Sequence, residues 1–141
     1  MPYANPTAKT TPKQRLNVVA IIVVGCNLYP LFLSSRLAYM FLFRVIGQPW
    51  DFYLTGGLTS LTAMGTLLAS LTVILRQRTL AVYFQWLAVL ALLTSALVTL
   101  WDALDHHVGP DSLLIVTGIP LLITLLLAWS AWFLKRMDDN K

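Results

Sequence analysis

The densest group of side chains able to do chemistry lies between two long apolar runs, in the segment WDALDHHVGPDS that begins at Trp101. If the preceding helix continues one turn past Trp101, Asp102 and His106 stand four residues apart on one face, with Asp105 adjoining. Carboxylates and imidazoles bind divalent cations such as zinc. A zinc site needs three or four ligands from the protein, and water fills the open position when there are three. Asp102, Asp105 and His106 are therefore the candidate metal ligands, and the alternative is a solvated polar loop.

The residue types in this sequence give little support for other kinds of catalytic site. Two adjacent histidines are too few for a membrane di-iron hydroxylase, and neighbouring residues cannot bind opposite faces of one haem. The sequence contains neither a Gly-rich phosphate loop nor the nucleophile-elbow spacing of a serine hydrolase. Cys26 is the single cysteine, so it forms no intrachain disulfide. These observations favour a non-catalytic protein without a cofactor.

Composition indicates which elements must position these residues. Of the 141 residues 57% are hydrophobic and 11% are charged, whereas soluble domains carry about a quarter charged residues. Four apolar runs are each long enough, at about 1.5 Å per residue, to approach the roughly 30 Å hydrocarbon thickness of a bilayer. The sequence predicts an all-α integral membrane protein, a four-transmembrane-helix bundle within residues 16–134. Its helices are expected at residues 16–35, 54–75, 80–101 and 113–134.

Basic residues predict how the bundle is oriented. With the amino terminus inside, eight of the ten lysines and arginines face the cytoplasm, and only Arg36 and Arg44 face outward. Both termini are therefore expected in the cytoplasm, and the expected location is a bacterial inner membrane. Dispersed basic residues suit an anionic lipid surface and not nucleic acid. The remaining segments are a cytoplasmic tail at 1–15, an outer interfacial segment at 36–53, an outer acidic loop at 102–112 and a cytoplasmic tail at 135–141.

Hydroxyl side chains recur on one face of the second predicted helix, opposite a leucine-rich face that contains Leu61 and Leu68. Leucine gains nothing by leaving lipid for another helix, so packing in a bilayer selects small and hydroxyl-bearing residues. We expect these hydroxyl residues to face protein; the alternative is that they line a polar path in an oligomeric channel. This hydroxyl stripe consists of Thr55, Thr59, Thr62, Thr66 and the flanking Ser70.

Two polar residues in or beside the first predicted helix are candidate binding residues. Pro30 lacks an amide hydrogen and so leaves the carbonyl of Cys26 without its helical partner, which favours a kink. Asn27 lies beside that defect and needs hydrogen-bond partners inside hydrocarbon. It either joins two helices or contacts a ligand or ion at a broken helix. Arg36 is expected at the outer edge, where it reaches the headgroups or pairs with an outer aspartate.

Three classes of function fit these features. The first is a non-catalytic subunit or partner-binding component of a larger membrane complex. The second is a small oligomeric channel or transporter, with an acidic outer vestibule and the hydroxyl stripe and Asn27 along its route. The third is a membrane enzyme or metal-binding protein that uses Asp102, Asp105 and His106. The expected partners are the lipid bilayer and other membrane subunits or further copies of the chain.

Overall fold

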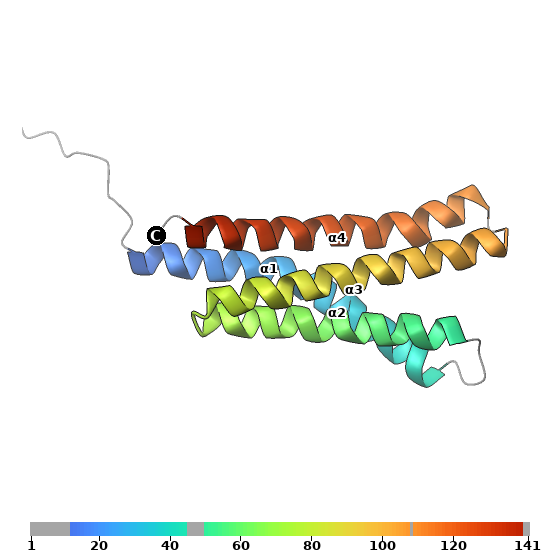
Figure 1. Cartoon of the computed structure of the whole chain (residues 1–141), viewed down its shortest axis with the longest axis horizontal. Coiled ribbons are helices and arrows are strands. Elements are labelled where there is room, and N and C mark those ends of the chain that lie inside the picture. Colours follow the sequence, from blue (N-terminus) through green and yellow to red (C-terminus); the bar gives the residue numbers. More distant parts are fainter. Residues whose placement is uncertain (1–11, 45–49, 108, 140–141) are drawn as a thin grey trace, which may run out of the picture.

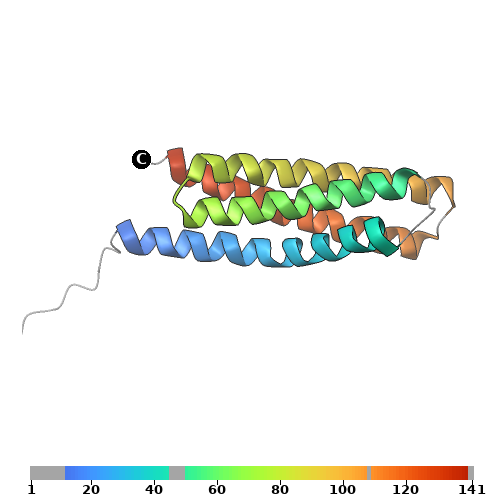
Figure 2. The ribbon, with the colours of Figure 1, turned by 90° about the horizontal axis from the view of Figure 1, so that it is seen from below.

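The computed structural model describes the backbone of residues 12–44, 50–107 and 109–139, and everything it describes is helical apart from turns. Four long helices lie side by side with alternating direction (Figures 1 and 2). They are α1 (Pro12–Tyr39), α2 (Trp50–Ile74), α3 (Arg78–Asp105) and α4 (Pro110–Asp139), with a short π-helical segment η1 (Met40–Arg44) after α1. The predicted amino-terminal tail lies mostly outside the described residues.

The prediction of an all-helical chain with four long apolar helices is confirmed. Each helix contains a segment that is long and apolar enough to cross a membrane. These segments are Val18–Tyr39, Phe52–Ile74, Arg78–Asp105 and Pro110–Met137.

The helices are longer than the apolar runs that predicted them. α1 begins at Pro12 and α4 at Pro110, several residues before the expected starts at 16 and 113. Proline is favoured at the first helical position, because an amide hydrogen there would have no helical partner. α3 continues to Asp105 instead of ending near residue 101. Hydropathy marks the part of a helix that fits in hydrocarbon, whereas the helix itself continues until its backbone hydrogen bonds are interrupted.

The short connection between α2 and α3 reverses the chain through a backbone cap. Arg76 adopts a left-handed conformation, with φ of 65°. Its amide donates to the Val73 carbonyl at 3.0 Å, and the Gln77 amide donates to the Thr72 carbonyl at 2.8 Å. This is the Schellman pattern, in which glycine usually occupies the left-handed position. The tight turn makes α2 and α3 antiparallel neighbours.

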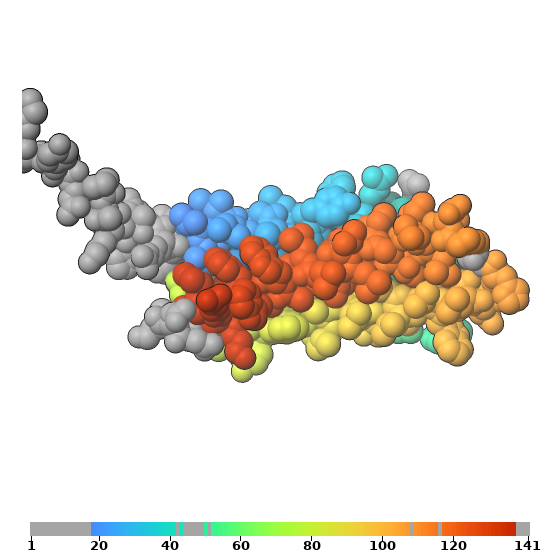
Figure 3. Space-filling view, turned by 90° about the horizontal axis from the view of Figure 1, so that it is seen from above, coloured from blue at the N-terminus to red at the C-terminus, as the bar shows by residue number. Residues whose placement is uncertain are grey.

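Each helix packs against two others around the bundle. α2 lies between α1 and α3, and α4 packs mainly on α3 and more lightly on α1. Figure 3 looks onto α4, with α1 along one side of it and α3 along the other. α1 and α3 are diagonal, and the described part of the chain has no backbone contact between them.

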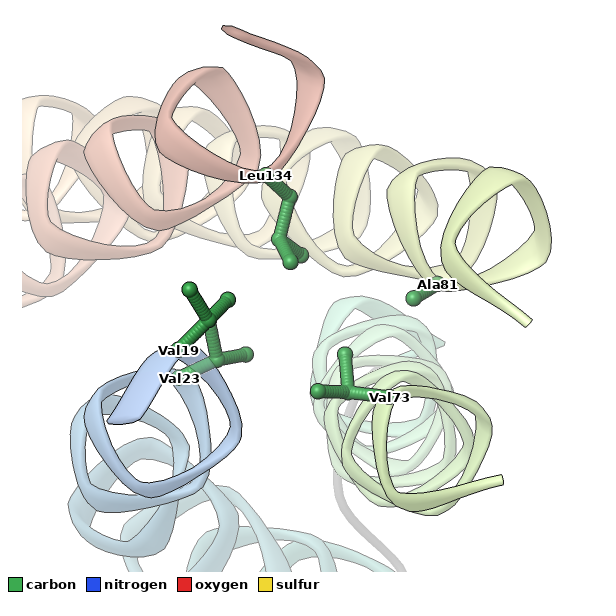
Figure 4. Close-up of a cluster of buried hydrophobic side chains, with 5 residues drawn as sticks. All are labelled: Val19, Val23, Val73, Ala81 and Leu134. Atoms are coloured by element: carbon green, nitrogen blue, oxygen red, sulfur yellow. The ribbon is translucent and has the colours of Figure 1, made fainter. Parts of the chain in front are cut away.

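The two ends of the bundle differ in arrangement. The start of α1, the end of α4 and the α2–α3 turn lie at one end, which we call the turn end (Figure 1). There a hydrophobic layer joins all four helices (Figure 4): Val19, Val23, Val73, Ala81 and Leu134. The opposite end, which we call the loop end, holds η1, the start of α2, the end of α3 and the start of α4 (Figure 1). At the loop end the α3–α4 hairpin diverges from α2 and η1 (Figure 1).

Candidate functional site

A pair of buried amides bridges the bundle axis. The Gln85 Nε2 donates to Asn27 Oδ1 at 2.8 Å, and the Asn27 Nδ2 donates to Gln85 Oε1 at 3.1 Å. Asn27 is 1% exposed and Gln85 is fully buried. Their helices, α1 and α3, are diagonal, so these two long side chains span the centre where the backbones do not meet.

Further hydrogen bonds extend the pair to the other two helices. Asn27 Nδ2 also donates to Ser70 Oγ on α2 at 3.1 Å, with the Thr66 carbonyl at 3.4 Å. Gln85 Nε2 reaches Ser130 Oγ on α4 at 3.4 Å and the Leu127 carbonyl at 3.5 Å. We call Asn27, Ser70, Gln85 and Ser130 the amide network. An unpaired amide would be costly in a dry interior, whereas hydrogen bonds between membrane helices each contribute about 0.6–2 kcal/mol.

The amide network places Asn27 among protein partners. Its carbonyl oxygen and its amide nitrogen both have hydrogen-bond partners on other helices. α1 continues as a helix through Pro30. Sequence reasoning missed Gln85, although a single amide inside the run LAVYFQWLAV is the same signal that singled out Asn27. Their meeting depends on both residues lying at the same depth, which neither local pattern reports.

The hydroxyl stripe lies against protein, and most of its hydroxyls bond to their own helix. All five of its residues are buried, while Leu61 on the opposite side is exposed. The Thr62 hydroxyl donates to the Leu58 carbonyl at 2.9 Å, and that of Thr66 donates to the Thr62 carbonyl at 3.0 Å. Thr59 and Ser70 make equivalent bonds one turn back. This pattern satisfies hydroxyls inside a bundle without a partner on another helix.

A close helix contact involves Gly65, a residue that the sequence reading passed over. A Cβ atom added at Gly65 would lie 3.0 Å from the Ala88 Cβ and 3.1 Å from the Phe84 carbonyl oxygen. Glycine therefore lets α2 approach the backbone of α3, as small residues do between membrane helices. Gly57, also on α2, has open space at the same position.

The structure brings together two of the three candidate metal ligands. His106 Nδ1 lies 3.2 Å from Asp102 Oδ1 and 3.0 Å from the Asp102 carbonyl oxygen. Both side chains are substantially exposed, and so is Asp105. Among the described residues, no group of three or more His, Cys, Asp or Glu side chains is placed to hold a metal ion. The pair stands at the carboxyl end of α3. Metal binding by the loop stays a prediction.

Arg36 lies on α1, exposed, one turn before that helix ends. Its possible partner Asp102 lies on the diagonal helix α3, and the only ion pair between described side chains joins Asp102 to His106. The described part of the structure therefore leaves Arg36 on the surface and gives it no aspartate.

Comparisons of the chain with protein-family models, with curated proteins and with solved structures found no match.

Proposed function

We propose that this chain is an integral membrane protein with four spans and both termini in the cytoplasm, and that it is a non-catalytic, partner-binding subunit of a larger complex in a bacterial inner membrane. The amide network is the observation that carries the proposal. It puts amides and hydroxyls inside the bundle, while large apolar side chains cover the outside of all four helices. That distribution suits a hydrocarbon surrounding, in which polar groups must find partners within the protein.

The interior supports a structural role over transport through a single chain. The hydrophobic layer of Val19 and Leu134 closes the turn end, and the amide network lies directly beyond it along the axis. The hydroxyls of Thr62 and Thr66 are engaged with their own helix backbone, and both residues are fully buried. A second apolar cluster, which includes Leu92 and Leu127, fills the space between α3 and α4.

α4 supports a role in binding another subunit. From Pro110 to Leu122 none of its described side chains is buried. Its exposed residues include Trp129 and Trp132, and Arg136 lies 5.3 Å from the centre of the Trp132 ring. Aromatic and arginine side chains are enriched where proteins bind one another. A neighbouring subunit packed on α4 would cover this face.

The complex is tested by isolating tagged protein in polymer-bounded discs of native membrane, without detergent, and measuring the mass and composition of the particles. We expect a fixed set of different partner proteins at constant stoichiometry. Particles that contain only a ring of this chain would favour the channel class, and particles with one chain and lipid would contradict a subunit role.

The topology is tested with reporters. A reporter fused after Lys141 should be cytoplasmic, and one inserted near Gly109 should be external, because most basic residues lie on the side of the termini. Opposite labelling at either site would overturn four spans with both termini inside.

A further inference from the structure

α3 is longer than a bilayer requires. Its 28 residues correspond to about 42 Å, whereas the hydrocarbon core is about 30 Å thick, or about 20 helical residues. Arg76 and Arg78 at the turn end mark the inner edge of the hydrocarbon. About 20 residues from Arg78 reach Val98, so Trp101 and Leu104 lie beyond the outer edge. A tilt of about 20° changes this estimate by only a few per cent.

The outer edge of the hydrocarbon can also be located on α1 and α2, by counting residues from the layer in Figure 4 that all four helices share. Ala81 shares that layer with Val19 and Val73. The rise from Ala81 to Val98 is about 17 residues, and an equal rise from Val19 ends at Arg36 on α1. Counting back equally from Val73 ends near Gly56 on α2. A charged side chain at this level agrees with an outer edge of the hydrocarbon here, because arginines at helix ends reach toward the headgroups.

Beyond this level large apolar side chains stay exposed. On this count Trp101 lies about 5 Å past the hydrocarbon, within the aromatic belt of a bilayer. Phe43, Trp50 and Leu104 lie about 9–10 Å past it, whereas the headgroup region is only about 5–7 Å thick on each side. Lipid chains do not reach those three. Each of the four is more than half exposed. Phe43 lies on η1, Trp50 on α2, and Trp101 and Leu104 on α3. We call Trp101 and Leu104, which lie three residues apart on α3, the outer patch.

The surroundings of the outer patch are acidic. Asp105 and Asp111 are exposed, and Asp102 is partly so. The segments beyond the outer edge together carry four aspartates against two arginines. An apolar surface with an acidic rim suits a partner with an apolar face and basic side chains around it. A second copy of this chain, presenting the same acidic end, would be repelled.

We propose that the outer patch docks the extracytoplasmic part of a partner membrane protein, which presents basic side chains around an apolar face. This inference rests on the proposed function, because it requires the loop end to be external. It assigns the partner contact to the end of the bundle where lipid cannot cover the apolar side chains.

Photo-crosslinking at paired positions of α3 tests the docking in living cells. Leu104 and Leu97 lie seven residues apart on one face and are each 56% exposed, but Leu97 lies within the hydrocarbon. A photoreactive amino acid at 104 should give a discrete protein adduct, and the same group at 97 should give lipid adducts. With Asp102→Lys and Asp105→Lys, the adduct at 104 should fall at least about tenfold, because like charges would then face each other. The same lipid adducts at both positions, an adduct between two copies of this chain, or an adduct unchanged by the charge reversal would overturn the proposal.

The isolated discs distinguish this failure from failure of the proposed function. If partners co-purify equally with the wild type and with the charge-reversed variant, the complex exists but does not dock through the outer patch. If the wild type has no partner, the subunit role itself fails. The reporter near Gly109 verifies that the charge-reversed variant still inserts correctly.

Discussion

The two halves of the bundle are held together by different means. In the half nearer the turn end, the apolar layer and the amide network join all four helices. In the half nearer the loop end, α4 buries no described side chain before Ile123, and its hairpin diverges from α2. Thr117 there bonds to the carbonyl of Leu113 in its own helix. In a bilayer apolar surface gives little reason for helices to close, so close packing and shared polar contacts decide where they stay together.

The largest effect is expected at Gly65, where α2 packs tightly against the backbone of α3. Gly65→Leu should lower the free energy of unfolding by about 3 kcal/mol, because the new side chain meets backbone that cannot move aside. Gly57→Leu, at an open position of the same helix, should change it by less than about 1 kcal/mol. Unfolding in mixed micelles measures both. Equal losses would mean that α2 and α3 do not approach each other through Gly65.

A larger side chain in the hydroxyl stripe should destabilise the bundle. Thr62→Leu should lower the free energy of unfolding by about 2 kcal/mol, since Thr62 is fully buried and the added volume separates helices. Leu61→Ala, on the exposed side of the same helix, should cost less than about 1 kcal/mol. The same micelle assay compares the two. A more damaging change at Leu61 would mean that the faces of α2 are assigned in reverse.

The amide network should behave as one unit. Asn27→Leu and Gln85→Leu should each lower the free energy of unfolding by about 1–2 kcal/mol, because each leaves the other amide short of partners. The double variant should cost about as much as either single change, and a double-mutant cycle measures that coupling. Gln77→Leu, at an exposed glutamine without a cap bond, is the control. Additive losses would show that the two amides do not depend on each other.

The smallest effect on stability is expected at the exposed loop. Replacing both Asp102 and His106 with Ala should change the free energy of unfolding by less than about 1 kcal/mol, as is usual for exposed ion pairs. Elemental analysis of the same proteins tests the loop as a ligand site. A stoichiometric metal in the wild type that the double variant lacks would establish the site. A wild type that stays free of metal after purification with zinc would show that Asp102 and His106 do not form a zinc site.

Local patterns predicted most of the helices and the two faces of α2, because both depend on residues near one another in sequence. Apolar length fixes a span, and a period near 3.6 fixes which side chains share a face. The same reasoning placed Asp102 and His106 on one face, four residues apart. It also put Asp105 beside them, but no group of three such side chains among the described residues is placed to hold a metal ion.

The sequence by itself determined that this protein has four apolar helices, with amides and hydroxyls set within them. Only the tertiary structure decided that Gln85 meets Asn27 across the diagonal, that Gly65 packs against the backbone of α3, and that Arg36 stays away from Asp102. The physical reason is that each of these relations depends on the relative depth and rotation of two helices. Those quantities are set by packing over the whole bundle, and no short stretch of sequence contains them.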